Sequence, residues 1–183
     1  MPLDHFSLIA PIYARAHYHA IDRMCEFAAL PAAGRLLDVG GGTGRVAFAL
    51  RGLVGEIVVT DISMGMLEKT PRTTIQPASC FSESLPFPND SFERVIMVDA
   101  LHHVVDQAAT AGEMLCVLKP GGRLVIEEPD IRTFAVKLIA VAEKLLWMRS
   151  HFLSPAQIAS LFSQAKTDIF TDGPTAWIVV EKR

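Results

Sequence analysis

The chain has 183 residues, of which 50% are hydrophobic and 20% are charged, and its formal net charge at pH 7 is −3. This length suits one domain with a substantial core, and this composition excludes an intrinsically disordered chain. The balance of 17 basic and 20 acidic residues excludes the basic excess typical of nucleic-acid or anionic-membrane binding, so we expect no nucleic-acid partner.

Short β-rich runs alternate with helical stretches through the first two thirds of the chain. Lys119-Pro120-Gly121-Gly122 ends the last of these helices, because proline and glycine do not continue it. Continuous apolar strands separated by helices are typical of a parallel sheet covered on both faces. The expected elements are a helical segment over Asp4–Ala29, strands over Arg35–Val39, Glu56–Thr60, Thr74–Ala78, Arg94–Val98 and Arg123–Glu127, and helices over Thr43–Leu50, Ser63–Lys69 and Gln107–Leu118.

The last third of the chain predicts two helices followed by a β-hairpin. Ser154 is a good N-cap and Pro155 suits the first position of the second helix. Thr171-Asp172-Gly173-Pro174 is a turn signal between two β-rich runs. No linker separates these elements, so we expect residues 1–183 to form one domain. The expected elements are helices over Ile131–Arg149 and Ser154–Ser163 and strands over Lys166–Phe170 and Ala176–Glu181.

The cysteines and the N-terminus bear on the cellular compartment. Cys25, Cys80 and Cys116 are widely separated and form no CxxC pair, which indicates single buried thiols rather than a disulfide framework or a zinc site. The start, MPLDHFSLIAP, has an acid and a histidine where a signal peptide carries basic residues. The most apolar window, Phe134–Met148, is interrupted by charges and too short to cross a bilayer. We therefore expect a cytoplasmic protein.

The stretch LLDVGGGTGRVA combines an apolar strand that ends in Asp38 with a glycine-rich turn and the start of a helix. Glycines at such a turn let a ligand approach the backbone closely. The dinucleotide fingerprint GxGxxG fails, because its last position counted from Gly40 is Arg45. Instead Gly40, Gly42 and Gly44 alternate. A ligand that lacks phosphates and carries an amino acid needs a nearby carboxylate for its ammonium group, and this spacing favours such a ligand.

Several stretches carry a resemblance to a known family. LLDVGGGTG resembles motif I of the class I S-adenosylmethionine-dependent methyltransferases. SESLPFPNDSFERVIMVDALHHV (Ser82–Val104) and MLCVLKPGGRLVIEEP (Met114–Pro129) resemble the UbiE-like, "type 11" branch, and DHFSLIAPIY (Asp4–Tyr13) is similar to the start of quinone and related small-molecule methyltransferases. The resemblance implies an α/β fold with a doubly wound, Rossmann-like sheet of seven strands, mostly parallel with an antiparallel last strand. It also implies S-adenosyl-L-methionine as the cofactor.

The chain departs from the family pattern in two places. Where the family commonly has an acid that accepts the adenine amino group, this chain has Phe81. The resemblance then leaves the adenine edge to backbone groups or to Glu83. The Tyr-Asp pair expected after IAP is Tyr13-Ala14.

The resemblance assigns roles to residues at the strand ends. Asp61 closes the strand IVVTD and matches the acid that holds both ribose hydroxyls. Asp38 would bind the methionine end, directly or through water; a strand-end acid satisfied by amides of the glycine turn is the structural alternative. Ile62 would pack on adenine, and Asp99 and Leu101 would border the methionine end. The expected cofactor-binding residues are Asp38, Gly40, Gly42, Gly44, Asp61, Ile62, Glu83, Asp99 and Leu101.

His102 and His103 follow the fourth expected strand and face the expected mouth of the cleft. No carboxylate or cysteine accompanies them at ligand spacing, so we expect no metal. By family analogy His103 is the candidate catalytic residue, a general base with a pKa near neutral. The alternative is a residue at a helix start that packs against the cofactor.

Two segments have competing interpretations. His17, Tyr18 and His19 lie on the N-terminal segment, residues 1–30, which covers the cofactor in the family but reads equally well as an exposed helix face. The helix over Ile131–Arg149 ends with Trp147-Met148 and has a broad apolar stripe, for which core packing, a substrate wall and a homodimer surface are the alternatives. The stripe consists of Phe134, Leu138, Ile139, Val141, Ala142, Leu145 and Leu146.

The leading hypothesis is an S-adenosylmethionine-dependent methyltransferase that acts on a small molecule, for which the UbiE branch suggests a quinone-like acceptor. The protein would position the acceptor for in-line displacement and exclude water. The absence of a large inserted lid after the fifth strand favours a small acceptor. The alternative is a non-catalytic protein of the same fold that binds S-adenosylmethionine or S-adenosylhomocysteine or acts as a scaffold. A nicotinamide-dependent oxidoreductase is contradicted by Arg45 at the last glycine position.

Overall fold

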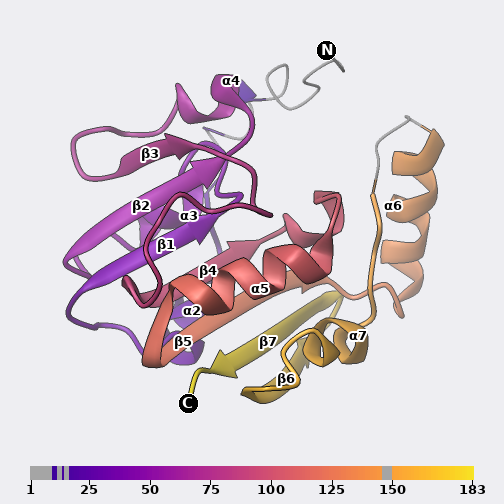
Figure 1. Ribbon diagram of the computed structural model, residues 1–183. Helices are drawn as coiled ribbons and strands as arrows, with labels where there is room; N and C mark the ends of the chain where they lie inside the picture. The colour runs from indigo at the N-terminus through magenta and orange to yellow at the C-terminus, as the bar shows by residue number, and fades with distance from the viewer. Residues whose placement is uncertain (1–9, 12–13, 15–16, 146–149) are drawn as a thin grey trace.

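A seven-stranded sheet in the order β3-β2-β1-β4-β5-β7-β6 organises the molecule (Figure 1). The computed structural model describes the chain except residues 1–9, 12–13, 15–16 and 146–149. The pairs from β3 to β5 in this order are parallel, and β7 runs antiparallel to both β5 and β6, which confirms the predicted doubly wound sheet with an antiparallel last strand. The strands are β1 Arg35–Val39, β2 Glu56–Asp61, β3 Gln76–Ser79, β4 Phe92–Val98, β5 Leu118–Pro129, β6 Lys166–Asp172 and β7 Thr175–Glu181.

Helices cover both faces of this sheet, so the central strands are buried on both sides. On one face Leu37 and Val39 of β1 pack in the cluster that contains side chains of α5 and α7. On the other face Leu36 packs with side chains of α2 and α3. The described helices are α2 Ile21–Phe27, α3 Arg45–Ala49, α4 Met64–Leu67, α5 Gln107–Val117, α6 Phe134–Leu145 and α7 Pro155–Ser160, with a 3₁₀ turn, η1, at Leu101–His103.

The strand order reverses between β1 and β4, and this places the ligand crevice. The chain runs outward from β1 through β2 to β3 and then returns to pair β4 with the other edge of β1. In doubly wound sheets the crevice outside the carboxyl ends of the strands at such a reversal takes the ligand. The glycine turn after β1 and the segment after β4 therefore meet at one edge.

Local backbone geometry explains where the predicted helix boundaries differ. We expected the helix after the glycine turn to begin at Thr43, but α3 begins at Arg45, because Gly44 has a left-handed φ of +73°. Ser154 caps α7 in a capping box with Gln157 and Pro155 is its first residue, as predicted.

The N-terminal segment is less helical than predicted. The backbone over His17–Ala20 is not helical, and α2 begins only at Ile21. Instead, the side chain of Tyr18 donates a hydrogen bond to Glu127 on β5, with 2.6 Å between the Oη of Tyr18 and the Oε2 of Glu127. The stretch Asp4–Tyr13, on which part of the family resemblance rests, lies largely outside the described residues.

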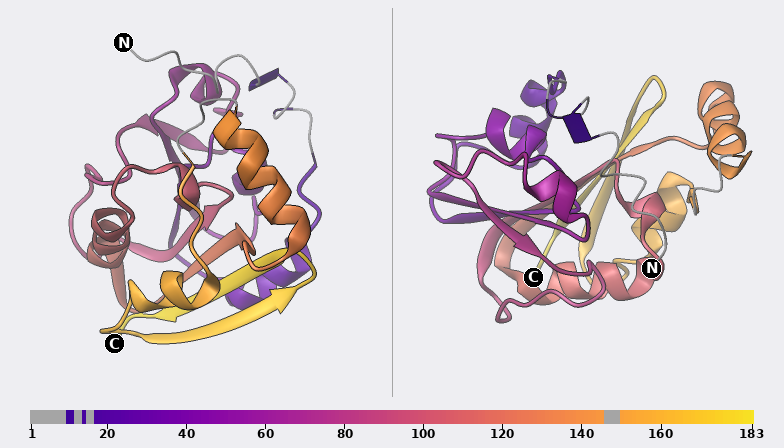
Figure 2. Two further views of the ribbon diagram at one scale, coloured as in Figure 1. Left: turned by 90° about the vertical axis from the view of Figure 1, so that its right-hand side faces the viewer. Right: turned by 90° about the horizontal axis from the view of Figure 1, so that it is seen from above.

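The predicted long helix is shorter at its start and stands apart from the sheet in the view from above (Figure 2). Its beginning is delayed to Phe134 because the Asp130 carboxylate binds both the N–H and the guanidinium of Arg132 in a turn. The core interpretation of the stripe is wrong for three of its residues, Phe134, Leu138 and Val141, whose exposed fractions are 76%, 56% and 58%. Trp147 and Met148 lie outside the described residues.

Two further sequence expectations concern thiols and membranes. All three thiols are free, but Cys116 is exposed and Cys25 and Cys80 are only half-buried, so the prediction of buried thiols is wrong for Cys116. In the described part of the chain no helix has both the length and the apolar character needed to span a bilayer.

Candidate active site

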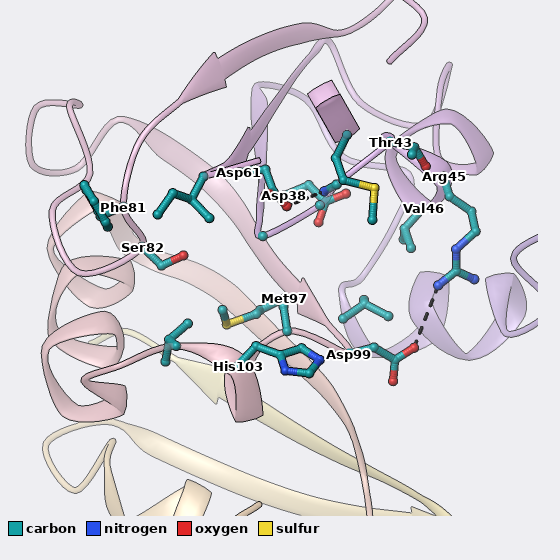
Figure 3. A pocket seen from close by; sticks show the side chains of 18 of the residues that line it. Asp38, Thr43, Arg45, Val46, Asp61, Phe81, Ser82, Met97, Asp99 and His103 are labelled. Carbon is teal, nitrogen blue, oxygen red and sulfur yellow. Dashed lines mark hydrogen bonds and ion pairs between the residues drawn. The ribbon is translucent and has the colours of Figure 1, made fainter. Parts of the chain in front are cut away.

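A cavity of about 210 Å³ lies at the carboxyl ends of β1, β2 and β4, where the strand order reverses (Figure 3). Its lining comes from the glycine turn and from the segments that follow β2, β3 and β4. Most of the predicted site residues meet here, although they come from four different loops and strands between Asp38 and His103. Asp38, Gly40, Gly42, Asp61, Ile62, Glu83, Asp99 and His103 line the cavity, whereas Gly44 and Leu101 do not.

The glycine turn is closed by the protein's own side chains at most positions and open at one. A Cβ added at Gly40, Gly41 or Gly44 would lie 2.5 to 2.9 Å from a neighbouring side-chain atom. At Gly42, with φ of +58°, the nearest atoms would be 3.8 Å away, on Asp61 and Met66, which both line the cavity. Gly42 is therefore the position in this turn where a missing Cβ leaves room for a ligand.

Asp38 is a buried acid without a partner at the floor of the cavity. Its exposed fraction is 0%, and neither carboxylate oxygen has a hydrogen-bond partner among the described residues. Burial raises the pKa of Asp38 to about 7. The positive charge of Arg45 and the N–H of Ala47 oppose this rise, although the Ala47 N–H does not reach hydrogen-bond geometry. The alternative in which amides of the glycine turn satisfy this acid therefore fails. An unpartnered buried carboxylate that lines a cavity fits a cationic ligand.

Asp61 ties the end of β2 to the glycine turn. Its two carboxylate oxygens accept hydrogen bonds from the N–H of Gly42 at 2.9 Å and from the N–H of Ser63 at 2.8 Å. The carboxylate is thereby held in a fixed orientation on the cavity wall. A carboxylate oxygen can accept more than one hydrogen bond, so an oriented carboxylate on the cavity wall can also accept the hydroxyls of a ligand.

One end of the cavity is apolar. Ile62 and Phe81 line it with exposed fractions of 59% and 61%, a large apolar exposure that a flat aromatic ligand group would cover. Glu83 is nearby, but its Oε1 accepts the N–H groups of Val105 at 2.9 Å and Asp106 at 3.2 Å. The Glu83 carboxylate therefore fixes the loop after η1, and this engagement makes it less available as a reader of the ligand.

His103 lines the cavity, but it does not have the pKa near neutral that we expected. Burial lowers the pKa of His103 to about 3, and the neighbouring His102 adds to this effect. Its Nδ1 lies 3.3 Å from the Oγ of Ser150. The imidazole is therefore neutral at pH 7 and carries a lone pair that accepts a hydrogen bond.

His102 does not line the cavity and belongs to the loop that positions its neighbour. Its Nδ1 lies 2.5 Å from Oε2 of Glu128, and both side chains are buried. The other oxygen of Glu128 accepts the N–H groups of Ala100 and Leu101 at 2.8 and 2.7 Å. Leu101, which we expected to border the ligand, is instead 1% exposed and packs in the core.

Arg45 is the main cavity residue that the sequence did not identify as part of the site. Its guanidinium lies 3.8 Å from the Asp99 carboxylate across the cavity (Figure 3). The sequence did contain a signal for it, because Arg45 replaces the last glycine of the dinucleotide pattern. No group of three or more His, Cys, Asp or Glu side chains in the described ranges is arranged to hold a metal ion.

Comparisons with known proteins agree on one family. The model of a family described as "Methyltransferase domain" matches residues 13–167. The ubiquinone/menaquinone biosynthesis C-methyltransferase UbiE of Geobacter sulfurreducens is 38% identical over 146 residues, which make up 68% of this chain and 56% of that protein. UbiE of Coxiella burnetii is 39% identical over 112 residues, covering 55% of this chain and 45% of that protein. The chain spans about half the length of these curated relatives.

Solved structures share the fold over most of the chain. A SAM-dependent methyltransferase of Thermotoga maritima superposes with a TM-score of 0.79 at 20% identity, covering 97% of this chain and 98% of that chain. The YcgJ protein of Bacillus subtilis gives a TM-score of 0.74 at 26% identity, covering 85% and 71% of the two chains.

The buried acid predicts a measurable effect of pH on stability. The pKa of Asp38 lies above its ordinary value of 3.8, so between about pH 4 and 7 the folded protein holds a proton that the unfolded chain releases. The stability of the ligand-free protein therefore falls as the pH rises through this window. Asp38→Asn removes the cost of ionising this group in the folded protein. Compared with the wild type, we expect the variant to gain at most about 4 kcal/mol more stability at pH 8 than at pH 4.

Urea denaturation of the wild type and of Asp38→Asn at both pH values measures this difference. Asp168→Asn, on the exposed strand β6, is the matched control and should follow the wild type. Parallel pH profiles for wild type and Asp38→Asn would show that the buried acid does not control this dependence.

Proposed function

The chain belongs to the methyltransferase domain family, and on that premise we propose that it transfers the methyl group of S-adenosylmethionine to a small-molecule acceptor. One observation carries the proposal: the buried carboxylate of Asp38, which has no hydrogen-bond partner among the described residues, lines the same cavity as Gly42, where the turn is open. A buried charge without a partner costs folding free energy, and a cationic ligand offsets that cost.

The residues that line the cavity fit the cofactor part by part. Asp38 would hold the α-ammonium group, and Gly42 would let the ligand pass close to the backbone. Asp61, whose carboxylate is held on the cavity wall by the N–H groups of Gly42 and Ser63, would accept the two ribose hydroxyls. Ile62 and Phe81 would cover the faces of adenine, and its polar edge is left to backbone groups near Phe81. When bound, the cofactor supplies a methyl carbon activated by the attached sulfonium.

The protein's own contribution is positioning, with His103 beside the acceptor. A neutral imidazole on the cavity wall accepts a hydrogen bond from an acceptor hydroxyl and orients its oxygen or the ring carbon beside it. Its low pKa makes this imidazole a weak base in the free protein. We therefore propose that His103 mainly orients the acceptor. It would take up the acceptor's proton only while the acceptor attacks the methyl group.

A quinone-like acceptor is the class that we favour. The UbiE relatives are named for ubiquinone and menaquinone biosynthesis, and this chain shares the matched half of their length. Val105 lines the cavity and is 86% exposed, so it provides apolar surface for such a ring or its tail. The exposed apolar side chains of α6 lie outside the cavity lining and would extend this surface. We propose α6 as a wall of the acceptor site; a second copy of the chain is the alternative occupant, and sedimentation velocity would detect it.

We also propose that residues 1–183 act as one methyltransferase domain in which residues 1–30 cover the cofactor. Tyr18 supports this proposal, because its side chain is half-buried and bonded to Glu127 next to Asp99 of the cavity. An exposed helix face, the competing interpretation, does not account for that bond.

Calorimetric titration followed by turnover tests the function. We expect S-adenosylmethionine and S-adenosylhomocysteine to bind and NADH not to bind. We then expect transfer of a labelled methyl group to at least one member of a panel of hydroquinones and phenols. Binding of NADH without either sulfur ligand would contradict the proposed function. Binding of both sulfur ligands without turnover on the panel would favour a non-catalytic binding protein.

Gly42 offers a sharper test of where the cofactor passes. A valine side chain there would project toward Asp61 and Met66 inside the cavity, so Gly42→Val should weaken S-adenosylhomocysteine binding by more than 10-fold. Gly52→Val is the matched control, because Gly52 has a similar positive φ of +82° but meets nothing within 4 Å. The control should lose about 1–2 kcal/mol of stability to backbone strain and keep its affinity. Equal affinities in both variants would mean that the cofactor does not cross this turn.

His103 predicts a loss of turnover without a loss of cofactor binding. Removing the hydrogen-bond acceptor in His103→Ala should reduce kcat by about 10²-fold on the best acceptor of the panel, and His103→Asn should restore part of it. Because the pKa is about 3, no inflection of the pH–rate profile between pH 5 and 8 should belong to this residue. A wild-type inflection in that range that disappears in His103→Ala would instead indicate a base that titrates near neutral.

A further inference from the structure

A chain of charged and polar contacts runs from the cavity to the N-terminal segment. The Arg45 guanidinium lies 3.8 Å from the Asp99 carboxylate and 5.6 Å from the centre of the Tyr18 ring. The Tyr18 hydroxyl donates a hydrogen bond of 2.6 Å to Oε2 of Glu127. Glu127 is the third residue from the end of β5. Its carbonyl oxygen accepts a hydrogen bond from the N–H of Asp99, which follows β4. Asp38 lines the same cavity as Arg45 and Asp99, and the charge of Arg45 acts on its carboxyl group. We call Tyr18, Arg45, Asp99, Glu127 and Asp38 the acid cluster.

The acid cluster holds more negative than positive charge. It contains three carboxylates, and Arg45 is its single cation. Asp38 and Glu127 are buried, with exposed fractions of 0% and 9%, whereas the Asp99 side chain is about half-exposed. One guanidinium cannot neutralise three carboxylates in a poorly solvated site. Protonation of carboxyl groups of the cluster is therefore favoured in the ligand-free protein.

The electrostatics of the two buried acids agree with this count. Burial raises the pKa of Glu127 to about 7; Asp99 and Glu128 raise it further, and the Tyr18 hydroxyl and Arg45 oppose the shift. For Asp38, also raised to about 7 by burial, Arg45 is the opposing charge and Asp61 adds to the rise.

Two neighbouring acids are engaged elsewhere. Asp61 accepts the N–H groups of Gly42 and Ser63, and Glu128 contacts His102.

We infer that the acid cluster binds the α-ammonium group of the cofactor in exchange for a proton, with Glu127 and Tyr18 as positioning residues that are outside the cavity lining. The inference rests on the proposed function, since the ammonium belongs to the proposed ligand. A carboxyl O–H in the cluster breaks and its proton passes to solvent. The ammonium then supplies the positive charge that the proton supplied before. Arg45 remains as the counter-charge for the ligand's own carboxylate.

The exchange makes affinity depend on pH and on one part of the ligand. At low pH the carboxyls are neutral and attract the ammonium weakly; as the pH rises toward 7 they ionise and the attraction grows. Each proton released raises the affinity up to 10-fold for each pH unit below the pKa of the free cluster. A ligand with the same adenosine part but no amino acid, such as 5′-methylthioadenosine, has no charge to exchange. Its affinity should be the same across this range.

Isothermal titration of S-adenosylhomocysteine and 5′-methylthioadenosine between pH 5.5 and 7.5 tests the inference. Titrations at each pH in phosphate and in imidazole buffers, which differ in ionisation enthalpy, give the number of protons released. We expect 0.5 to 2 protons released at pH 6 with S-adenosylhomocysteine and none with 5′-methylthioadenosine. Affinity for the first ligand should rise at least 10-fold across the range.

Variants separate the cluster from general effects of pH. Glu127→Gln should cut the proton release with S-adenosylhomocysteine by about half while leaving 5′-methylthioadenosine binding unchanged. Glu68→Gln, at an exposed acid that follows α4 and does not line the cavity, should change neither. Tyr18→Phe removes a donor that stabilises the charged acid, so the rise in affinity should move to higher pH. Tyr18→Phe serves as the second variant if Glu127→Gln does not fold.

Each outcome has one meaning. Binding of S-adenosylhomocysteine without proton release, or an equal pH dependence for both ligands, would overturn the inference and leave the proposed function standing. Proton release that is unchanged in both Glu127→Gln and Tyr18→Phe would overturn the role of these two residues. Failure of both ligands to bind would remove the proposed function and this inference together.

Discussion

The burial of a carboxylate at the end of the central strand is the constraint on which the site depends. Strand β1 pairs with β2 on one edge and β4 on the other, and helices cover both of its faces. Any side chain at its carboxyl end is therefore removed from bulk water, and the cost for an acid is high. Asp38 lies at this position, and its carboxylate receives no hydrogen bond from the turn that follows it. The rest of the cavity is arranged around this uncompensated group.

The loops around Asp38 are held by other acids, each of which binds two backbone N–H groups. Asp61 fixes the glycine turn to the start of α4, Glu128 fixes the approach to η1, and Glu83 fixes the loop into α5. A carboxylate with two backbone donors is well satisfied and orients both segments. The site is thus organised before a ligand arrives, and among these four acids Asp38 alone lacks such donors. This difference, which sequence spacing does not reveal, is the reason why we propose Asp38 as the partner of a cationic ligand group.

Local signals predicted most of the fold, and interactions between distant segments account for the rest. The strands, the glycine turn and the Ser154 cap depend on residues within a few positions, so composition and spacing identify them. The non-helical backbone at Tyr18 depends on Glu127, 109 residues away, and so does not follow from the N-terminal sequence. Similarly, the hydrogen bonds that the Glu83 carboxylate accepts from Val105 and Asp106 join it to the loop after η1 and do not follow from the sequence around Glu83. The low pKa of His103 follows first from the burial of its ring in the folded protein, which the neighbouring residues do not predict.

Arg45 connects the sequence pattern with the electrostatics of the site. A dinucleotide turn needs glycine at this position so that its helix packs closely on the strand and leaves its N-terminus to the pyrophosphate. Here the side chain at the same position extends across the cavity to Asp99 and over the ring of Tyr18. It therefore brings a positive charge into a group of acids that would otherwise repel one another. The residue that argues against a dinucleotide is thus also the one whose charge offsets the repulsion among the acids of the cavity, where we propose that an amino-acid group binds.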